Sequence, residues 1–477
     1  MKKIFWLLML CLSSLTVTAQ NEISGLKNQA AADIQSNREN YKKIALSIWG
    51  YAEVGYKEFK SSQLLQSKLK ENGFQVKSGV AGIPTAFVAT YGSGKPVIGI
   101  LGEFDALPGL SQDSTSTKSP IRNSNAGHGC GHHLFGTGSV AAGIAIKKLM
   151  EEGKIKGTLK IFGCPAEEGG SGKVFMVREG LFNDVDVAIH WHPNDANQVT
   201  FTSALANKSA KFRFYGISAH ASASPENGRS ALDAVESLDY MVNMMREHVP
   251  QETRIHYVIT NGGKAPNVVP DFAEVYYYVR HPERSMAVSI FDRIAKAAEG
   301  AALGTGTKMD YEIIGGTHDL LINKTLAVAM QKNLEKVGGV VYSPSEEKFA
   351  EKIQTTLMGD IPSPDSAAIV KPLHIEKSRG STDVGDVSYA VPTVGVETAT
   401  WVPGTSAHSW QAVACGSQDI GIKGMLVAAK TMAFTAIDLF TDPELIKKAK
   451  EEFVKSKGDY QYKPLLGDIK PALNYRD

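Results

Sequence analysis

Cysteine is scarce in this sequence, with four residues in a chain of 477. Cys11 lies in a basic and then apolar N-terminal stretch, which leaves Cys130, Cys164 and Cys415 for the rest of the chain. So sparse and odd a set excludes a disulfide scaffold, and at least one thiol stays free. A free thiol suits a metal ligand. For Cys164 and Cys415, a small buried apolar side chain is the simpler interpretation.

An excess of charge is lacking as well. The chain has 51 lysine and arginine residues against 50 aspartate and glutamate residues, and no basic block stands out. The sequence therefore does not indicate nucleic-acid binding. Beyond the N-terminus we find no apolar run long enough to predict a membrane span, so we expect no membrane partner.

The N-terminus is typical of a secretory signal. Residues 1–3 read Met-Lys-Lys, residues 4–15 are mainly apolar, and residues 17–19, Val-Thr-Ala, offer a small-residue cleavage site. The apolar part is too short for a spanning helix. We therefore expect residues 1–19 to be a signal peptide and the protein to be exported, either to the periplasm or as a secreted protein.

The remaining chain, of which 43% is hydrophobic, is long enough for more than one domain. Apolar runs at residues 96–101 and 158–162 alternate with helical patterns at residues 37–73 and 136–150, which predicts a mixed α/β sheet flanked by helices. Near residue 206 the pattern changes to β-α-β-β-α-β, the order of a ferredoxin-like sandwich, and α/β patterning resumes at about Asn323. We expect an α/β domain in two parts, residues 20–205 and 319–442. Residues 206–318 would form the inserted domain, and residues 443–477 a peripheral tail.

The most informative segment is His-Gly-Cys-Gly-His at residues 128–132. Thiolate and imidazole groups are ligands that transition metals prefer. Gly127, Gly129 and Gly131 would permit the tight turn that brings these groups to one point. A predicted strand leads in and a small-residue helix leads out, so the segment is expected at the carboxyl edge of the sheet, where open α/β folds place their sites.

A carboxylate pair, Glu167-Glu168, follows the strand predicted at residues 158–162. Adjacent side chains point in different directions, so one carboxylate would bind a cation while the other handles a proton. A metal lowers the pKa of a bound water to about 7, and a nearby carboxylate can take its proton and deliver it to a leaving amine. The alternative is an acidic pair that merely favours a helix N-terminus.

Further histidines would complete a metal site. Period-two alternation in residues 186–193 puts His190 and His192 on the same face of a strand. Either would serve as a ligand, and the pattern does not choose between them. His408 lies in a loop rich in glycine, serine and threonine, where a lone histidine is usually a surface residue.

Five separated motifs resemble the aminoacylase/carboxypeptidase (peptidase M20) group of metal-dependent amidohydrolases, and the likeness runs through most of the mature chain. They are Gly-Glu-Phe-Asp-Ala-Leu-Pro at 102–108, residues 127–132, Glu167-Glu168, Ser-Ala-His-Ala-Ser at 218–222, and the His408 loop. Residues 191–193 and 380–388 are most similar to the p-aminobenzoyl-glutamate hydrolase branch, in its B-type subunits. The resemblance implies a catalytic α/β domain interrupted by a ferredoxin-like lid and dimerisation domain.

The resemblance also implies roles for single residues. Glu167 would be the general base, and His220, from the lid of a partner subunit, would hold the substrate's carbonyl oxygen as charge develops. Asn267 would assist there, and Arg280 would pair with a substrate carboxylate. His133 departs from the group's usual aspartate, which bears on metal preference. Two divalent ions, zinc or manganese, would be bound by Cys130, His132, Glu168, His192 and His408, with His190 as the alternative to His192.

The sequence thus predicts hydrolysis of the amide bond of N-acyl or N-aroyl amino acids by metal-activated water, with Glu167 as the base. The expected substrate is a small amide with a free carboxylate, of the p-aminobenzoyl-glutamate kind. We expect a homodimer, with a second related subunit as an alternative. A broad dipeptidase or aminoacylase and a non-catalytic periplasmic metal- or solute-binding protein also remain open. Pure binding needs no proton shuttle, so Glu167 beside Glu168 speaks against the last.

Overall fold

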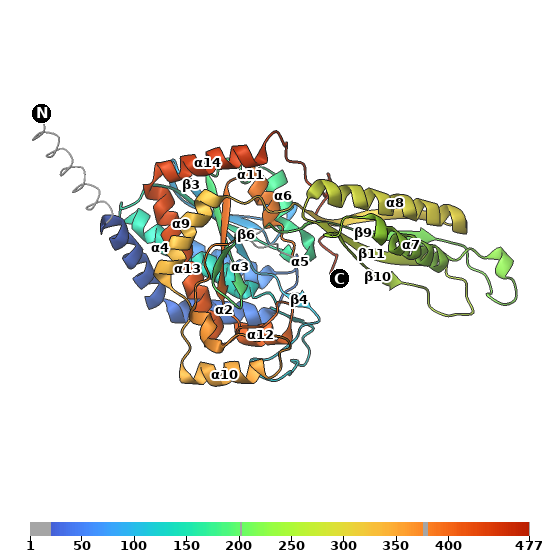
Figure 1. The fold of residues 1–477 in the computed structure, drawn as a ribbon, viewed down its shortest axis with the longest axis horizontal. Helices are drawn as coiled ribbons and strands as arrows, with labels where there is room; N and C mark the ends of the chain where they lie inside the picture. Colours follow the sequence, from blue (N-terminus) through green and yellow to red (C-terminus); the bar gives the residue numbers. More distant parts are fainter. Residues whose placement is uncertain (1–20, 201–202, 375–379, 477) are drawn as a thin grey trace, which may run out of the picture.

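The computed structural model describes residues 21–200, 203–374 and 380–476. The predicted signal peptide at residues 1–19 lies outside the described residues. Figure 1 shows two parts: a large body, in which helices surround a sheet, and an elongated arm that extends from one side of it.

A seven-stranded mixed sheet forms the centre of the body, and it confirms the predicted fold class. Four neighbouring strands are parallel, while the outer strands β1, β2 and β8 run antiparallel to their neighbours. Strand β3 is buried along its whole length, as its continuous apolar sequence requires of a strand covered on both faces. In spatial order the strands are β1 (Gln75–Ser78), β2 (Phe87–Ser93), β6 (Gly157–Cys164), β3 (Val97–Glu103), β7 (Val187–Asn194), β13 (Thr393–Ala399) and β8 (Gln198–Thr200).

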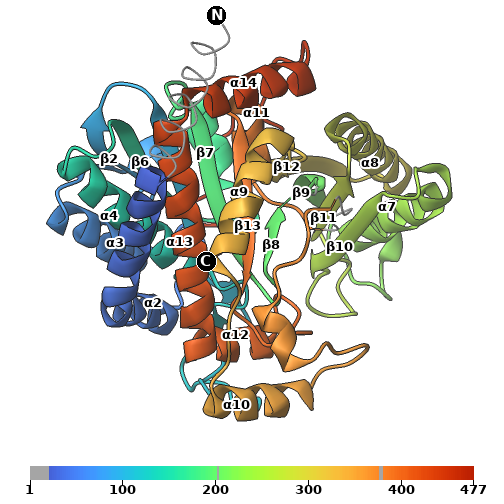
Figure 2. The ribbon, with the colours of Figure 1, turned by 60° about the vertical axis from the view of Figure 1, so that its left-hand side comes forward.

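Helices cover both faces of this sheet. One face carries the larger apolar core, and Figure 2 shows α13 and α9 crossing it in front of β13 and β8. The helices that contribute to this core are α2 (Arg38–Tyr51), α3 (Phe59–Glu71), α4 (His132–Glu151), α9 (Lys324–Val337), α13 (Asp419–Thr441) and α14 (Pro443–Lys457). The opposite face is covered by α6 (Gly172–Arg178) and α11 (Val384–Ala390).

Shorter elements complete the body. Strands β4 (Leu107–Pro108) and β5 (Ala126–Gly127) pair with each other and so hold two of the sequence motifs side by side. The others are α5 (Glu167–Gly170), α10 (Pro344–Gln354) and α12 (Trp410–Gly416).

Two expectations about helices were wrong. The pattern at residues 37–73 is not one helix, because Ala52 adopts a left-handed conformation that ends α2, and α3 begins only at Phe59. Helix α13 is, by length and composition, apolar enough to span a membrane, contrary to our expectation. Yet 89% of its apolar window is buried inside the protein, as in the core helix of a large sheet.

The arm begins at Ala206 and ends at Thr317, and its element order is β-α-β-β-α-β. Its four strands are all antiparallel, in the spatial order β10-β11-β9-β12. Buried and partly exposed residues alternate along β11, because one sheet face packs against the two helices. The bounds are β9 (Ala206–Tyr215), α7 (Ala231–Met245), β10 (Arg254–Asn261), β11 (Phe272–His281), α8 (Arg284–Thr305) and β12 (Lys308–Thr317).

Candidate metal centre

The site lies at the carboxyl ends of β3, β6 and β7, where the chain leaves the sheet. Gly131 precedes α4 with a φ of +73°, and a Cβ atom there would lie 2.7 Å from the Cβ atom of Pro193. Only glycine allows this approach without strain. Trp191 further ties β7 to α4, since its indole Nε1 donates a hydrogen bond of 3.0 Å to the carbonyl of Phe135. These contacts bring the end of β7 against the His-Gly-Cys-Gly-His segment.

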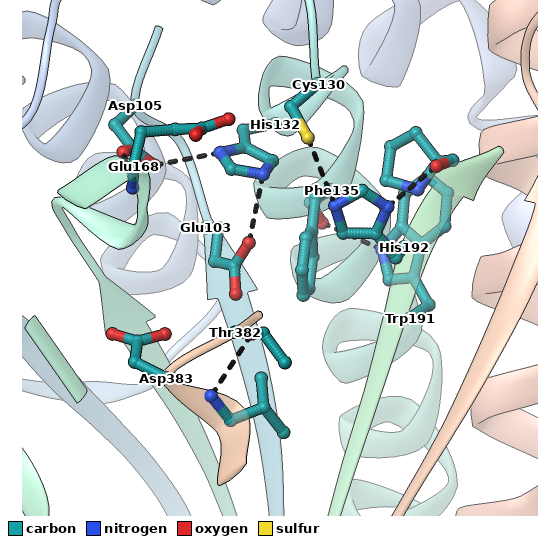
Figure 3. A network of polar contacts seen from close by, with 12 residues as sticks. Glu103, Asp105, Cys130, His132, Phe135, Glu168, Trp191, His192, Thr382 and Asp383 are labelled. Atoms are coloured by element: carbon teal, nitrogen blue, oxygen red, sulfur yellow. Dashed lines mark hydrogen bonds and ion pairs between the residues drawn. The ribbon is translucent and has the colours of Figure 1, made fainter. Parts of the chain in front are cut away.

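Potential ligand atoms gather here in three groups, each with its atoms within 4.8 Å of one another. Figure 3 shows Cys130 pointing toward His192, with Sγ 3.4 Å from Nε2. His408 Nε2 lies 3.2 Å from Glu168 Oε1. The groups are Cys130, His132 and His192; Cys130, Glu168 and His408; and Glu103, His132 and Glu167. All five side chains expected as ligands are therefore brought together.

His190, the alternative ligand, lies elsewhere on the same strand. Within the described residues it belongs to none of these groups. Its ring packs against β13, where a Cβ atom on Gly395 would lie 2.2 Å from Nε2. The geometry therefore places His192, and not His190, beside Cys130.

Asp105 orients two of these groups, a role that the sequence did not reveal. One of its carboxylate oxygens lies 2.9 Å from His132 Nδ1, and the other accepts a hydrogen bond of 2.9 Å from the backbone N–H of Glu168. Burial raises the pKa of Asp105, but contact with His132 outweighs it and leaves the pKa below its ordinary value. The sequence did offer a signal for this role, because Asp105 lies inside the motif at residues 102–108 and two residues beyond a buried strand.

A buried charge network was missed as well. Lys173 is fully buried, with Nζ 2.6 Å from Glu103 Oε1 and 2.5 Å from Asp383 Oδ1. Its backbone N–H also donates to Asp383 at 2.8 Å. The other oxygen of Glu103 lies 3.1 Å from His132 Nε2, so His132 stands between two carboxylates (Figure 3).

The carboxylate pair points in two directions because its turn is irregular. Ala166 and Gly169, on either side, both have positive φ. Glu167 therefore joins Glu103 and His132, whereas Glu168 joins Cys130 and His408. Burial, followed by the charges of Glu103 and Glu168, raises the pKa of Glu167 well above its ordinary value. A carboxyl group with a raised pKa is suited to take up and release a proton.

The three residues expected to bind substrate are not together. Arg280 lines a cavity of about 590 Å³ together with Glu167, Glu168 and His192. His220 and Asn267 are exposed residues of the arm, beside each other through a backbone hydrogen bond of 3.0 Å between Ala221 N–H and the Asn267 carbonyl. Neither of them lines this cavity.

The tail is not peripheral, contrary to our expectation. Tyr475 and Arg476 both donate hydrogen bonds to the backbone carbonyl of Glu168, at 2.9 and 2.5 Å. The segment is held there by apolar side chains that pack against the core under α6, among them Leu466 and Leu473. The charged helix α14 that precedes them obscured this apolar character in the sequence.

The donor set fits divalent metal ions. His132 Nε2 and Glu168 Oε1 are buried and form no hydrogen bond among the described residues; their charged neighbours are Glu103, at 3.1 Å, and His408, at 3.2 Å. Unpaired buried polar atoms are costly unless an ion or ligand completes them. Burial, followed by the charge of Glu168, raises the pKa of the Cys130 thiol well above its ordinary value. A bound cation would reverse this, since a coordinating thiol is deprotonated.

Comparison with known proteins supports this chemistry. The family model for peptidase family M20/M25/M40 matches residues 99–359. The chain is 42% identical to the B-type subunit of p-aminobenzoyl-glutamate hydrolase of Escherichia coli (strain K12) over 446 residues, which cover 88% of this chain and 93% of that protein. It is 29% identical to Xaa-Arg dipeptidase of Mus musculus over 451 residues, which cover 91% of this chain and 93% of that protein.

Solved structures share the fold. A putative aminohydrolase from methicillin-resistant Staphylococcus aureus aligns with a TM-score of 0.63 at 17% identity, covering 87% of this chain and 100% of that one. A protein from Bacillus subtilis described as a dinuclear metal-binding peptidase of the M20 family aligns with a TM-score of 0.55 at 17% identity, covering 85% and 99%.

The charge network generates a prediction about stability. Lys173→Met leaves Asp383 buried without its counter-charge and Glu103 with His132 alone, so we expect the free energy of unfolding to fall by about 3–5 kcal/mol. Lys160→Met is the matched control, because Lys160 pairs at 2.6 Å with Asp184, whose side chain is 59% exposed. Such a pair contributes less than about 1 kcal/mol. Urea unfolding of both metal-free variants checks this, and equal losses would contradict it.

Proposed function

Since the chain belongs to peptidase family M20/M25/M40 and is a hydrolase of amide bonds, we propose that it cleaves N-acyl or N-aroyl amino acids of the p-aminobenzoyl-glutamate kind. The observation that carries the proposal is the cavity in which Glu167, the clustered donors and Arg280 face one space. The 42% identity to one chain of a p-aminobenzoyl-glutamate hydrolase supports this substrate class.

In this proposal the protein's side chains divide the work. Divalent ions held by the five clustered ligands would polarise the amide carbonyl and lower the pKa of a water. Glu167 accepts the proton of that water and returns it to the departing amine nitrogen. Asp105 keeps the ring of His132 in place. Zinc or manganese would suit the site, and the soft Cys130 thiolate favours zinc.

A homodimer is part of the proposal. Strand β10 is the edge of the arm's sheet, and Tyr257, Val258 and Ile259 are exposed along it. An exposed apolar edge strand is a ready surface for pairing with another chain. Within one chain, His220 does not line the cavity. Such a dimer would let His220 of the partner subunit reach it. Pairing with a second, related subunit is the alternative. Export directed by residues 1–19 also remains part of the proposal.

A broad dipeptidase is the second candidate, favoured by the 29% identity to Xaa-Arg dipeptidase. A dipeptide is also an amide with a free carboxylate, so the same cavity would accept it. The two candidates differ in the acyl group that they accept.

The experiment that tests the function is hydrolysis by the purified chain loaded with zinc or manganese. We expect chelator-sensitive cleavage of p-aminobenzoyl-glutamate that exceeds cleavage of Xaa-Arg and other dipeptides. The measured quantity is the amount of amino acid released from each substrate. Cleavage of the dipeptides alone would favour the second candidate. Full activity in chelator, with no metal left on the protein, would contradict the metal-dependent chemistry.

The neighbouring carboxylates should separate in a mutant comparison. Glu167→Ala is expected to retain bound metal but to lower kcat by at least about a hundredfold, because only proton transfer is lost. Glu168→Ala is expected to lose metal as well as activity, because it removes a ligand. Metal content by mass spectrometry and single-turnover kinetics check both. Normal turnover in Glu167→Ala would remove this residue from the reaction.

Complementation tests whether His220 acts across a dimer. His220→Ala and Glu167→Ala homodimers should both be inactive. In a mixed dimer, one site combines the intact Glu167 of one chain with the intact His220 of the other, and the second site lacks both. Half of the random dimers formed by co-expression are mixed, so about a quarter of wild-type activity should return. If isolated mixed dimers stay inactive, His220 does not act in trans.

A further inference from the structure

One wall of the cavity is built from polar groups that lack partners. Within the described residues, and apart from the candidate ligand Glu168, five of its lining side chains each have a buried polar atom without a hydrogen-bond partner. These atoms come from β9, β11, β12, the segment before α11, and the tail. Buried unpaired polar atoms cost free energy, so the presence of five such residues in the lining of one cavity points to a polar ligand. They are Asn207 Oδ1, Arg280 Nε, Thr317 Oγ1, Ser381 Oγ and Arg476 Nε.

Two of these residues are arginines that lie near Tyr278. The guanidinium carbon of Arg280 lies 5.5 Å from the ring centre of Tyr278. A Cβ atom on Gly169 would lie 3.3 Å from the Tyr278 hydroxyl and 3.6 Å from Arg476 Nη2, so Arg476 also approaches this tyrosine.

Among the described residues neither arginine forms an ion pair with a carboxylate, and the Nε atom of each has no hydrogen-bond partner there. Each is partly shielded from solvent, and both line the cavity that holds the metal donors. Arg476 is anchored through Nη2 on the Glu168 carbonyl, which orients the rest of its planar fork. Guanidinium groups without a carboxylate partner in a shielded cavity fit the carboxylates of a ligand, which they can bind in a bidentate manner.

We propose that Arg476, supplied by the tail, forms with Arg280 a subsite for the two carboxylates of an acidic amino acid, and thereby selects amides of dicarboxylic amino acids over neutral ones. The inference rests on the proposed function, because the subsite shares the cavity in which the amide is cleaved. One guanidinium takes the α-carboxylate and the other takes the side-chain carboxylate. The tail is then a determinant of specificity.

The rival explanation is that Arg476 only holds the Glu168 turn through its carbonyl contact. A purely positioning role would affect every substrate equally, since Glu168 serves all of them. A subsite for a second carboxylate would affect only substrates that carry one. Comparing a glutamate conjugate with an alanine conjugate of the same acyl group separates these roles.

The experiment uses the metal-loaded full chain with p-aminobenzoyl-glutamate and p-aminobenzoyl-alanine. For Arg476→Met we expect kcat/KM to fall by at least about thirtyfold on the glutamate conjugate, mainly through KM, and by less than about threefold on the alanine conjugate. Lys470→Met, an exposed residue of the same tail, is the control and should leave both values unchanged. Equal losses on both substrates would overturn the subsite.

Direct binding keeps this result separate from the fate of the proposed function. Wild-type protein should bind free glutamate more tightly than free alanine in calorimetry, and Arg476→Met should lose that preference. If the wild type cleaves neither conjugate, the proposed function fails. The calorimetric preference for glutamate over alanine still shows in that case whether the subsite exists. No preference in the wild type would overturn it. Should Arg476→Met not fold, Arg476→Lys takes its place. It keeps the charge without the planar fork and should lose affinity for glutamate alone.

Discussion

The fully buried ammonium group of Lys173, held between Glu103 and Asp383, is the constraint on which the site depends. It joins the end of β3, the start of α6 and the segment before α11, which are far apart in the sequence. Because an uncompensated buried charge is strongly destabilising, the three segments must stay in register. Glu103 also contacts His132, and so connects the buried ion pairs of Lys173 to one of the candidate ligands.

Around this network, neighbouring carboxyl groups acquire opposite properties. Burial and the charges of Glu103 and Glu168 raise the pKa of Glu167. For Glu168 burial acts in the same direction, but the contact with His408 outweighs it and lowers the pKa. Groups whose environments push their pKa values apart are suited to different tasks. The irregular turn that separates the two side chains would therefore support the proposed division between a proton-handling Glu167 and a cation-binding Glu168.

Much of the fold was predictable because local patterns carry it. The apolar run of β3 and the βαββαβ order after Ala206 predicted the mixed sheet and the inserted ferredoxin-like part, and the family comparisons confirmed the resemblance read from the motifs. The gathering of Cys130, His132 and Glu168 followed from glycine-bearing turns at strand ends. The catalytic and ligand roles of these residues remain predictions.

Other features depend on contacts that sequence patterns do not encode. Lys173 reads as an ordinary helical lysine, and only the folded structure shows both of its carboxylate partners. The break at Ala52 was missed because helical spacing continues on both sides of it. Arg476 and Tyr475 reach Glu168 only after the chain has passed along α14 and back to the junction of body and arm, as Figure 1 shows.

The central claim is that Cys130, which belongs to two of the three donor groups, would hold a pair of divalent ions together with the other ligands of those two groups. X-ray diffraction from crystals of the zinc-loaded protein, with data collected at the zinc absorption edge, tests it most directly. The account predicts two anomalous peaks, both within bonding distance of the Cys130 sulfur, one also bound by His132 or His192 and the other by Glu168 or His408. A single peak, or two peaks that leave Cys130 unbound, would contradict it.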